Sequence, residues 1–587
     1  MSLGNLTTLD FETEAIEGNP LIAPPVPVGL AVRWPDGRTA YLTDRQEMAV
    51  AFGEACNNGP VLFHNAPFDL SVAHTHLGIE WPHWSQIHDT MYLVYLKDPY
   101  AKSYGLKPSA ERYLDLPPDE QDACKEWIMA NIPQAKESNW GAFLARVPVE
   151  ILAPYAIGDV VRTYELFAAL EPDIPKEPYD RERELMPILV EATMRGVRVN
   201  TAALADALEV ATGAFEQADN RLRQALQAPA LNPGSSVQLA DALDAMGLVD
   251  EWAYTPTGAR STEMKSLRLN DPNIANLLKY RSTLKTLIGT FMTPWLEMNI
   301  NDRLHPNWNS TRGDRDGGTR TGRLSSSQPN FQNIPNPTGF PTPEGLPDLP
   351  HLRNFILPEE GHLWVKRDFS AQEIRVMAHF EDGLLAQSFR EDPDLDPHEL
   401  VRLEILRVTG VDYPRKYVKE TGFGILYGMG RFTLAQRLEI NSHEAWNLMQ
   451  AYKRAIPGVE QLQRGTKKRG QNDMPIRTWG GRLIYKEPAR IIKGEMRSFE
   501  YKLLNYLIQG SSADQTKQCI INWDKQRYKD DVFVATVHDE VNISAPIDHV
   551  QQSMETLRRM MDLSCEFNVP MRSEGFIGPS WGEVGDE

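Results

Sequence analysis

The apolar and polar positions of the first 178 residues alternate in a way that predicts a mixed unit of strands and helices. Runs of β-prone residues occur at 6–9, 28–34, 39–42 and 61–63. The second and third runs flank Pro35-Asp36-Gly37, a sequence that predicts a hairpin. Helical spacing takes over after about residue 85, and prolines at 172, 175 and 178 end the region. We therefore expect one α/β domain over residues 1–178.

Long helical stripes follow in the next part of the chain. Over residues 200–228 the apolar positions recur at steps of three and four. This stripe consists of Leu204, Leu208, Ala211, Phe215, Ala218, Leu222 and Ala225. A further helix is predicted over 274–296, so the segment should form a mostly helical arm. Residues 308–350 are rich in Gly, Pro, Ser, Thr and Asn and predict an extended loop, which is long for an idle connection.

Strand and helix signals alternate again in the C-terminal part. The pattern predicts a strand and then a helix over 352–380, a mainly helical region over 384–530 and a hairpin over 532–544. A chain of 587 residues exceeds what one hydrophobic core supports. The expected fold class is therefore multidomain, α/β at the N-terminal end and α+β beyond it.

The composition is that of an ordinary globular protein and excludes several classes. Hydrophobic residues make up 41% of the chain, and no apolar run approaches the roughly eighteen residues of a membrane helix. The N-terminus lacks a basic-then-apolar leader, so we expect no secretory signal and no membrane partner. The four cysteines are far apart and form no CxxC, which argues against a disulfide framework or a zinc site. A reducing, cytoplasmic location fits this pattern.

Charge is distributed unevenly along the chain. A net charge of −19 argues against a bulk nucleic-acid binder, because such proteins are usually basic. Residues 451–503 reverse the sign, with thirteen lysines and arginines against five acids. This segment is either a solvated basic face or a groove that follows phosphates, and its composition alone does not decide between the two.

Carboxylates recur at strand and helix ends in the N-terminal domain. Asp10 and Glu12 stand two apart at the end of a predicted strand, so their side chains leave the same face. Asp69 follows at a predicted strand-to-helix junction. Tyr155 and Asp159, four apart, share one face of a predicted helix. Each signal alone is more often structural, but together these acids suit a hard divalent cation.

In this order the set resembles the DEDD-type 3′→5′ exonuclease family, in its tyrosine-containing branch. Segments 89–91, 105–107 and 110–113 also resemble that family. The resemblance implies a ribonuclease H-like fold and two-metal hydrolysis. In that scheme Asp10 bridges two metals, and Glu12 and Asp159 complete their ligation. Asp69 supports the second ion, and Tyr155 orients the attacking water. The side chains that would hold the strand terminus are Phe11 and Asn65.

The C-terminal half carries two further acids with a regular stripe between them. Asp368 ends a predicted strand just before a helix, and Asp539 lies at the expected tip of the 532–544 hairpin. A hairpin tip alone is commonly no more than a turn. Steps of four place two cations and two aromatic side chains on one helical face, namely Arg415, Lys419, Phe423 and Tyr427. Cations suit a triphosphate and aromatic rings suit a sugar and base, so the stripe predicts a nucleotide-binding surface.

With this stripe, the chain resembles DNA polymerase family A, in particular the exonuclease-plus-polymerase part of the bacterial enzymes. The matching segments are 231–236, 255–258, 280–281, 321–326 and 329–335. The resemblance implies a right-hand polymerase that follows the exonuclease domain. The expected parts are the exonuclease at 1–178, the thumb and start of the palm at 179–330, the first part of the palm at 331–385, the fingers at 386–524 and the second part of the palm at 525–587. The 5′-nuclease domain of the bacterial enzymes is missing, so we expect a phage-like polymerase that acts in the cytoplasm of the host.

The resemblance also implies roles for single residues. Asp368 and Asp539 would bind the catalytic metals, with Glu540 beside them in a supporting place at the metal site. Lys419 would hold the triphosphate and protonate the leaving pyrophosphate, and Glu373 would exclude a 2′-hydroxyl. Further nucleotide contacts would come from His398, Arg415, Phe423 and Tyr427. The DNA contacts would come from Arg323, Asn505, Gln509 and His538.

The expected function is template-directed DNA synthesis with 3′→5′ proofreading, in the service of phage DNA replication. It implies two Mg²⁺ (or Mn²⁺) ions per active site, dNTPs and primer–template DNA as partners, and a monomer. One alternative is a nuclease whose C-terminal half only grips DNA, which would not need both C-terminal acids and the full stripe. The other is a non-catalytic replication scaffold, in which some metal and triphosphate positions should be replaced, and none is. Glu373 argues against an RNA polymerase.

Five positions depart from the family pattern. Tyr501 stands where the bacterial enzyme has Arg, and Ala371 stands where it has Gln, which puts one duplex contact and one pocket contact in question. Phe423 replaces the Tyr of some phage enzymes and predicts rejection of dideoxynucleotides. Gly158 and Pro154 depart from the usual third exonuclease motif, and Pro154 is well placed to open its helix.

Overall fold

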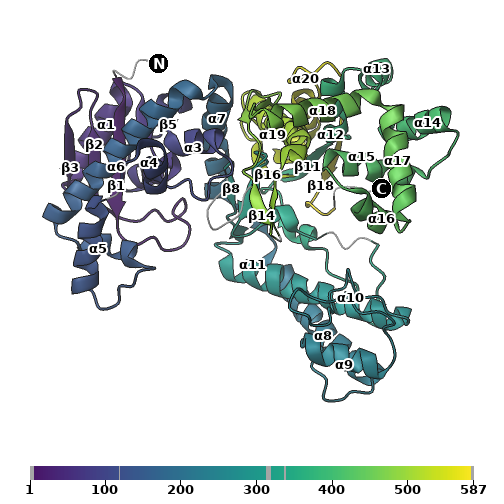
Figure 1. Ribbon diagram of the computed structural model, residues 1–587. Helices are drawn as coiled ribbons and strands as arrows, with labels where there is room; N and C mark the ends of the chain where they lie inside the picture. Colours follow the sequence, from purple (N-terminus) through teal and green to yellow (C-terminus); the bar gives the residue numbers. More distant parts are fainter. Residues whose placement is uncertain (1–4, 118, 312–318, 336–338, 493, 584–587) are drawn as a thin grey trace.

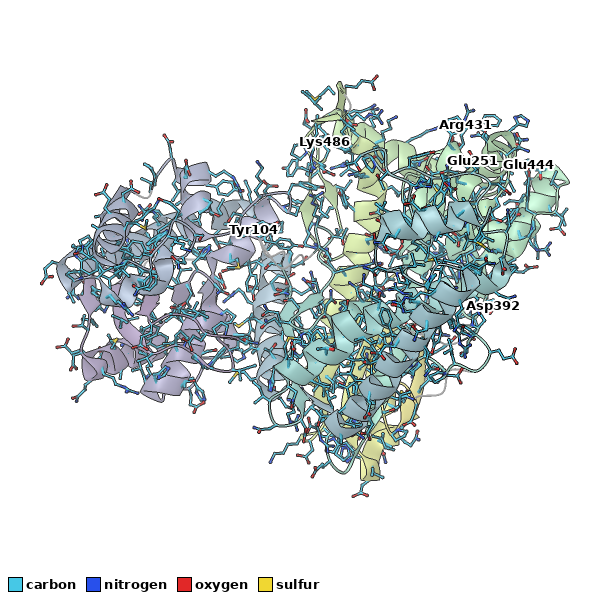
Figure 2. The ribbon with its side chains drawn as sticks, turned by 90° about the horizontal axis from the view of Figure 1, so that it is seen from below. Tyr104, Glu251, Asp392, Arg431, Glu444 and Lys486 are labelled. Carbon is cyan, nitrogen blue, oxygen red and sulfur yellow. The ribbon has the colours of Figure 1, made fainter. Side chains whose placement is uncertain are left out.

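The computed structural model describes residues 5–117, 119–311, 319–335, 339–492 and 494–583 (Figure 1). A sheet-based N-terminal unit lies beside a larger C-terminal body, and a helical arm extends away from their junction. The view from below (Figure 2) again shows unit and body side by side, with Tyr104 on the side of the unit that faces the body. The predicted multidomain class is confirmed. Within the predicted 308–350 loop, residues 312–318 and 336–338 lie outside the described part of the chain.

The N-terminal unit is built on a five-stranded sheet of order β3-β2-β1-β4-β5. Its strands are β1 (Thr7–Thr13), β2 (Pro27–Arg33), β3 (Thr39–Leu42), β4 (Val61–Phe63) and β5 (Ile87–Asp89). β2 pairs antiparallel with β1 and β3, whereas β4 pairs parallel with β1 and β5. The predicted hairpin and the predicted buried strand at 61–63 are therefore confirmed. The helices are α1 (Arg45–Asn58), α2 (Ala66–Val72), α3 (Thr90–Lys97), α4 (Leu106–Leu114), α5 (Asp119–Asn131) and α6 (Val149–Leu170).

Three local predictions for this unit are wrong. β1 continues to Thr13, so Asp10 and Glu12 lie within the strand and not at its end. β5 falls in the stretch where helical spacing was expected, because three residues become a strand only through pairing with β4. α6 begins at Val149, so Pro154 lies inside the helix and does not open it. Pro148 is the residue that sets the start, because its ring fixes φ at −55° directly before the first helical residue.

A linking helix, α7 (Lys176–Arg195), connects the N-terminal unit to the rest of the chain. The arm that follows consists of α8 (Thr201–Ala225), α9 (Ser236–Ala245), α10 (Pro272–Thr286), the π-helical segment Leu287–Met292 and α11 (Thr293–Met298). Both predicted arm helices are confirmed, and α8 packs lengthwise against α10. Ala225 is exposed, contrary to the predicted stripe, because the helix ends there and Leu226 turns into the core in its place.

The body is built on a four-stranded antiparallel sheet of order β16-β17-β11-β18. Its strands are β11 (His362–Phe369), β16 (Val532–Val537), β17 (Glu540–Pro546) and β18 (Ser573–Gly578). The predicted strand at 352–380 and the predicted hairpin at 532–544 are both present in it. α20 (Val550–Leu563) packs on the sheet, and α19 (Leu503–Asp524) packs against α20 and against α12 (Gln372–Glu381).

Helices dominate the region between the two halves of this sheet, as predicted. They are α13 (Leu384–Glu391), α14 (Pro397–Thr409), α15 (Arg415–Leu426), α16 (Arg431–Leu438), α17 (Ser442–Ala455) and α18 (Pro457–Gln471). Two small ribbons that the sequence pattern did not predict interrupt them, β12 (Ile476–Arg477) with β13 (Leu483–Ile484) and β14 (Arg490–Ile492) with β15 (Glu495–Arg497). Short strands also pair near the arm: β6 (Val197–Val199) with β7 (Arg303–Leu304) and β10 (Ile356–Leu357), and β8 (Asn307–Asn309) with β9 (Ser325–Ser327).

A buried ion pair fastens the linking helix α7 to the body. Lys517 Nζ on α19 donates to Glu182 Oε1 on α7 at 2.5 Å, and both side chains are only 1% exposed. Loss of either partner would leave an uncompensated charge in the core, which costs far more than loss of a partner in an exposed pair. The pair therefore holds α7, and the sheet unit before it, in a fixed relation to the body.

Two further findings bear on the sequence-based expectations. The four cysteines are free and buried, but Cys519 and Cys565 are not far apart in space, because their Sγ atoms lie 3.7 Å from each other. Among the described residues, none of the helices combines the length and the apolar character that crossing a bilayer requires.

Candidate active sites

Three carboxylates of the N-terminal unit converge on one point. β1 presents Asp10 and Glu12 on the same face, as the period of two predicts, and α6 brings Asp159 opposite them. One ligand oxygen from each of the three lies within 4.8 Å of the others. Glu12 and Asp159 are each 6% exposed. Oxygen ligands at this mutual distance match the preference of a hard divalent cation.

Asp69 lies next to this group but not in it. Its Oδ1 accepts a hydrogen bond of 2.8 Å from the backbone N–H of Phe11, the residue between the two β1 acids. Asp69 sits in the first turn of α2, and its side chain is 2% exposed. Asp69 therefore lies near the other three acids. Its carboxylate is hydrogen-bonded to the backbone of β1 and does not belong to the group of three converging oxygens.

The charges of these acids are unfavourable without a cation. Burial, then the neighbouring Asp69 and Glu12, raises the pKa of Asp10 well above its usual range. Burial, and next the charge of Asp159, raises the pKa of Glu12 to about 8. Burial likewise raises the pKa of Asp69 to about 8. A divalent cation would relieve both the burial and the mutual repulsion, so the donor set fits the metal that the sequence motif implies.

Tyr155 and a lysine complete this first site. Tyr155 is buried on α6, one turn before Asp159, so both predicted residues face the site. Lys107 Nζ, from the start of α4, lies 2.7 Å from Asp159 Oδ2 and 2.8 Å from the Tyr155 hydroxyl. In the sequence, segment 105–107 only resembles the exonuclease family, and no role for this lysine follows from that resemblance. Spacing alone gives no sign that α4 packs on α6, and this packing brings Lys107 to the carboxylates.

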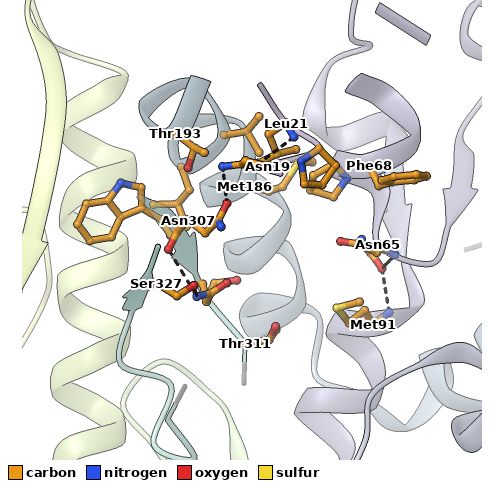
Figure 3. A pocket seen from close by; sticks show the side chains of 18 of the residues that line it. Asn19, Leu21, Asn65, Phe68, Met91, Met186, Thr193, Asn307, Thr311 and Ser327 are labelled. Atoms are coloured by element: carbon orange, nitrogen blue, oxygen red, sulfur yellow. Dashed lines mark hydrogen bonds between the residues drawn. The ribbon is translucent and has the colours of Figure 1, made fainter. Parts of the chain in front are cut away.

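A pocket of about 380 Å³ lies between the N-terminal unit and the body (Figure 3). Asn65 and Phe68 line it from the α2 side, and Asn307 and Ser327 line it from β8 and β9. Asn19 bridges the two sides, because its Nδ2 donates to Asn307 Oδ1 at 2.9 Å. Asn65 itself adopts a positive φ of 75°, a conformation that asparagine tolerates better than most residues. Asn65 therefore opens onto this pocket, whereas Phe11 is buried in a stack with Phe52 and is not available to a ligand.

The second site lies at the end of the sheet in the body. Asp368 is the next-to-last residue of β11, and Asp539 is at the β16–β17 tip, where Phe369 N donates to Asp539 O at 3.3 Å. Asp368 Oδ1 is buried and has no hydrogen-bond partner among the described residues. Burial, then the charges of Asp539 and Glu540, raises the pKa of Asp368 to about 7. Burial also raises the pKa of Asp539. An unpartnered buried oxygen beside a second carboxylate fits a cation site.

Glu540 was expected in a supporting place at the metal site, and its hydrogen bonds show how its carboxylate is held there. Glu540 pairs with Asp368 across the sheet, but its Oε1 accepts hydrogen bonds from Asn542 at 2.6 Å and from Trp581 at 2.9 Å. Its Oε2 lies 3.4 Å from Lys366 Nζ. Because both oxygens face protein donors, the structure supports a supporting role for Glu540 and not direct ligation.

The stripe on α15 faces this second site across a cavity of about 480 Å³. The residues that line the cavity include Arg323, Ala371, Glu373, His398, Lys419, Phe423, Tyr427, His538 and Asp539. Phe423 and Tyr427 stack at 6.2 Å with an interplanar angle of 15°. Glu373 Oε2 accepts from the Tyr427 hydroxyl at 3.1 Å, and its other oxygen accepts from Arg323. Residues from α12, α14, α15, the β16–β17 tip and the segment at Arg323 thus line one pocket that carries cations, aromatic rings and two acids.

Arg415 does not line the cavity in this conformation. Its Nε donates to Asp396 Oδ2 at 2.7 Å, at the mouth between α14 and α15. His398 is the second residue of α14, and the centre of its ring lies 5.9 Å from the centre of the Phe423 ring. Burial lowers the pKa of His398 to about 4, so the ring is neutral near pH 7. The guanidinium of Arg415 is therefore poised at the rim of the cavity.

The predicted DNA-contacting residues lie around the same cavity. Asn505 is on α19, and its Nδ2 is buried without a partner among the described residues. Gln509, one turn later on α19, contacts the Tyr427 hydroxyl. His538 adopts a positive φ of 57° at the hairpin tip, and its backbone N–H donates to Gln332 Oε1 at 3.1 Å. Gln332 is a fixed neighbour of this tip that the sequence analysis did not name as a site residue.

The departures Tyr501 and Ala371 have structural accounts. Gly428, just after α15, has a positive φ of +67°, and a Cβ there would lie 2.5 Å from the Tyr501 ring. The Tyr501 ring therefore lies against Gly428 at the end of the α15 stripe, where the bacterial enzyme has an arginine. Ala371 precedes α12 with a positive φ of 53° and lines the cavity. Its small side chain leaves room there that a glutamine would fill.

Comparison with known proteins agrees with this architecture. The model of DNA polymerase family A matches residues 202–583, and the model of the 3′-5′ exonuclease family matches residues 2–175. "DNA polymerase I" of Chloroflexus aurantiacus is 28% identical over 99% of this chain and 62% of its own length. "DNA polymerase DpoZ" of Vibrio phage phiVC8 is 26% identical over 95% of this chain and 93% of its own length. The chain thus spans less than two thirds of the bacterial relative.

A solved structure shares the fold over nearly the whole chain. The POL domain of Pol1 from M. smegmatis, in a complex with DNA primer-template and dNTP, superposes with a TM-score of 0.74 at 23% identity. The match covers 99% of this chain and 97% of that one. Since the polymerase model alone spans more than half of the residues, the chain belongs to DNA polymerase family A and carries a domain of the 3′-5′ exonuclease family at its N-terminal side.

Proposed function

We propose that the chain is a template-directed DNA polymerase that adds dNTPs to a primer 3′ end and proofreads the product with its own 3′→5′ exonuclease. The observation that carries this proposal is the cavity of about 480 Å³, because it joins three residues of the α15 stripe (Lys419, Phe423 and Tyr427) with Glu373 and Asp539 around one space. A protein that only gripped DNA would have no use for a pocket with Lys419 and two aromatic rings on one wall and the acid Asp539 on the other. The match to the phage relative covers 93% of that protein's length. This agreement in size supports a role in phage DNA replication, in the cytoplasm of a host cell.

The proposed domain assignment follows the two sheets and the arm. Residues 1–178 are the exonuclease, and 179–330 are the thumb and the start of the palm. Residues 331–385 and 525–587 are the two parts of the palm, which share one sheet. Residues 386–524 are the fingers, and α15 is the helix that would close on a correct base pair, so that fidelity comes partly from induced fit.

In the polymerase site, Asp368 and Asp539 would hold two Mg²⁺ or Mn²⁺ ions. Such ions, when bound, activate the primer 3′-oxygen and neutralise charge on the triphosphate. Lys419 lines the cavity and would hold the triphosphate, then give a proton to the leaving pyrophosphate. Arg415 would turn from the rim to the γ-phosphate side, and neutral His398 would donate a hydrogen bond to the β-phosphate. Phe423 and Tyr427 would stack around the base and sugar.

DNA contacts in the proposal come from the far side of the same cavity. Arg323, Asn505 and Gln509 would meet the minor-groove acceptors, which are nearly the same for every correct base pair. His538 would lie at the primer terminus, where the hairpin tip places it beside Asp539. The basic segment 451–503 would be a surface that follows phosphates, because the helices that carry its first part, α17 and α18, pack against α15 and α12, which line this cavity.

In the exonuclease site, Asp10, Glu12 and Asp159 would hold a second pair of divalent ions, with Asp69 bracing β1 between them. Tyr155 would orient the water that attacks the terminal phosphodiester. Asn65 would hold the last nucleotides of the strand from its pocket between unit and body. The products would be a 5′-mononucleotide and a primer shortened by one residue.

The direct test is a labelled primer annealed to a longer template, incubated with the purified chain and Mg²⁺. With all four dNTPs we expect the primer to lengthen to the end of the template, and without dNTPs we expect it to shorten. A chelator should stop both reactions, because both sites depend on carboxylate-bound cations. If the primer shortens but never lengthens, even when ordinary and modified dNTPs are supplied one by one, the chain is a nuclease and the polymerase proposal fails.

A second prediction concerns the choice of sugar. Replacing Glu373 with alanine should raise the use of ribonucleotides relative to deoxynucleotides by about 10- to 100-fold, because the change opens the space beside the 2′-carbon of the incoming sugar. The contacts with Arg323 and Tyr427 hold the Glu373 carboxylate at the cavity wall, so the exclusion is steric and fixed. Single-nucleotide insertion of rCTP and dCTP opposite guanine would measure the ratio.

The matched control for this variant is Glu391→Ala, which removes an exposed acid from the neighbouring α13. It should leave the ratio unchanged. An unchanged ratio in the Glu373→Ala variant as well would show that another residue excludes the 2′-hydroxyl.

A further inference from the structure

Lys107 places a positive charge inside the carboxylate cluster of the exonuclease site. Its Nζ lies 2.7 Å from Asp159 Oδ2 and 2.8 Å from the Tyr155 hydroxyl oxygen. The same nitrogen is 4.0 Å from the centre of the Tyr155 ring, and the lysine side chain is only 18% exposed. An ammonium so enclosed is part of the site and is not a solvated surface charge.

The two partners of Lys107 are the two α6 residues that the proposed reaction needs. Tyr155 and Asp159 lie one helical turn apart on the same face of α6, and a single ammonium spans both. An ammonium has three N–H donors and no acceptor. By donating to the tyrosine oxygen, Lys107 leaves the phenolic hydrogen to be donated elsewhere, so Tyr155 is fixed as a donor toward the cluster. By donating to Asp159 Oδ2, it fixes the rotation of that carboxylate.

The backbone of Lys107 is itself held in place. Lys107 is the second residue of α4, after Gly105 at the N-cap, and α4 packs along α6. The position of Lys107 relative to Tyr155 and Asp159 is therefore set by the packing of two helices and not by a mobile loop. On the other side of Asp159, Arg162 NH1 lies 3.6 Å from Oδ1, so cations flank this carboxylate from both sides.

In the same position, the Lys107 ammonium would repel a bound cation. The oxygens of Asp10, Glu12 and Asp159 that lie within 4.8 Å of one another would ligate a divalent ion, and a lysine bonded to one of these acids repels it. Without a metal ion, the ammonium is the nearest compensating charge of the cluster. Lys107 therefore has two opposite effects, since it orders the reacting groups and weakens the hold on the cation.

We propose that Lys107 is a positioning residue of the exonuclease site, which holds Tyr155 and Asp159 in their working orientation and competes with the divalent cation for the carboxylates. The proposal rests on the exonuclease function proposed above. The proposal predicts opposite effects on two quantities. Loss of the lysine should tighten metal binding and, at the same time, slow hydrolysis. A merely structural lysine would weaken both or neither.

The first measurement is Mn²⁺ binding to the full chain by isothermal titration calorimetry. It is made in an Asp539→Ala background, so that a ligand of the polymerase site is removed. Lys107→Met should lower the dissociation constant for Mn²⁺ by about tenfold, because one fixed positive charge next to the ion is gone. Lys107→Arg keeps the charge and should bind Mn²⁺ like the parent. The matched control is Lys102→Met, which removes an exposed lysine from the turn before α4 and should change nothing.

The second measurement is single-turnover hydrolysis of a labelled single strand at saturating Mn²⁺. Lys107→Met should slow it by about 10- to 100-fold, the loss that removal of an orienting partner at a metal site typically causes, and Lys107→Arg should restore part of the rate. If the lysine acts through Tyr155, the double variant with Tyr155→Phe should be little slower than Tyr155→Phe alone.

Three outcomes overturn the proposal. They are Mn²⁺ binding that is unchanged or weaker in Lys107→Met, full activity of Lys107→Met, and additive losses in the double variant. A chain without any hydrolysis in the unsubstituted form would instead refute the exonuclease function, while the Mn²⁺ titration would still decide whether Lys107 competes with the cation.

Discussion

Replacing Asp539 with alanine is expected to stop primer extension and to leave primer shortening intact. Asp539 is one of two acids that would hold the cations of the polymerase site, and Glu540 is bonded to Asn542 and Trp581, so it is not free to replace Asp539. We expect extension to slow by about 1,000-fold or more, which corresponds to about 4 kcal/mol of transition-state stabilisation. Single-nucleotide insertion on a matched primer–template measures the loss.

The same variant should fold normally. Burial raises the pKa of Asp539, so its charge opposes folding near neutral pH and alanine removes that cost. The charge of Asp539 also raises the pKa of Asp368, and this contribution disappears in the variant. Asp548→Ala, which removes an exposed acid just beyond β17, is the matched control and should extend primers at the full rate. Extension at the full rate by the Asp539 variant would place the polymerase metal site elsewhere.

Replacing Asp10 with alanine is expected to have the reverse result. Asp10 lies on β1 two residues before Glu12 and contributes one of the three converging oxygens, so its loss removes a ligand of the proposed exonuclease metal site. Shortening of a single strand should slow by about 1,000-fold or more, again about 4 kcal/mol. Extension should continue, and primers with a mismatched 3′ end should persist because they are no longer trimmed. The measurements are strand shortening without dNTPs and extension from matched and mismatched ends.

A melting experiment gives this variant a second readout. The folded-state pKa of Asp10 is raised above its usual value, first by burial and then by its acidic neighbours. A carboxyl with a raised pKa destabilises the folded state at a pH above its ordinary value, because the charged form is disfavoured there. In chelator at neutral pH, the alanine variant should therefore melt no lower than the unsubstituted chain. Glu17→Ala, an exposed acid beyond β1, is the control. If Asp10→Ala still trims strands at the full rate, the proposed metal site is wrong.

Local signals in the sequence predicted much of this molecule. The hairpin of β16 and β17 followed from alternation about a turn, because a period of two needs no information from elsewhere in the chain. The α15 stripe followed from steps of four, since a helix brings those side chains to one face by its own geometry. The same reasoning placed Asp10 with Glu12 and Tyr155 with Asp159.

Local signals failed where an element depends on a distant partner. β5 has three residues and exists as a strand because β4 lies beside it. Pro154 looked like a helix start, but the extended Pro148 before it already fixes the turn into α6. The carboxylate of Glu540 is chemically suited to bind a metal ion. Only the hydrogen bonds that it accepts from Trp581 and Asn542 show that it has another role.

The sequence by itself therefore determined most of the long elements, the order of the domains and the residue types that carry the chemistry, because each depends on spacing within one segment or on a family pattern. Tertiary structure alone decided which of these groups meet. It brought Asp368 to the tip that carries Asp539 through pairing of β11 with β17, and it brought Lys107 of α4 to Tyr155 and Asp159 of α6. The physical reason is that long-range contacts come from packing of apolar faces and strand edges, whose partners no local period specifies.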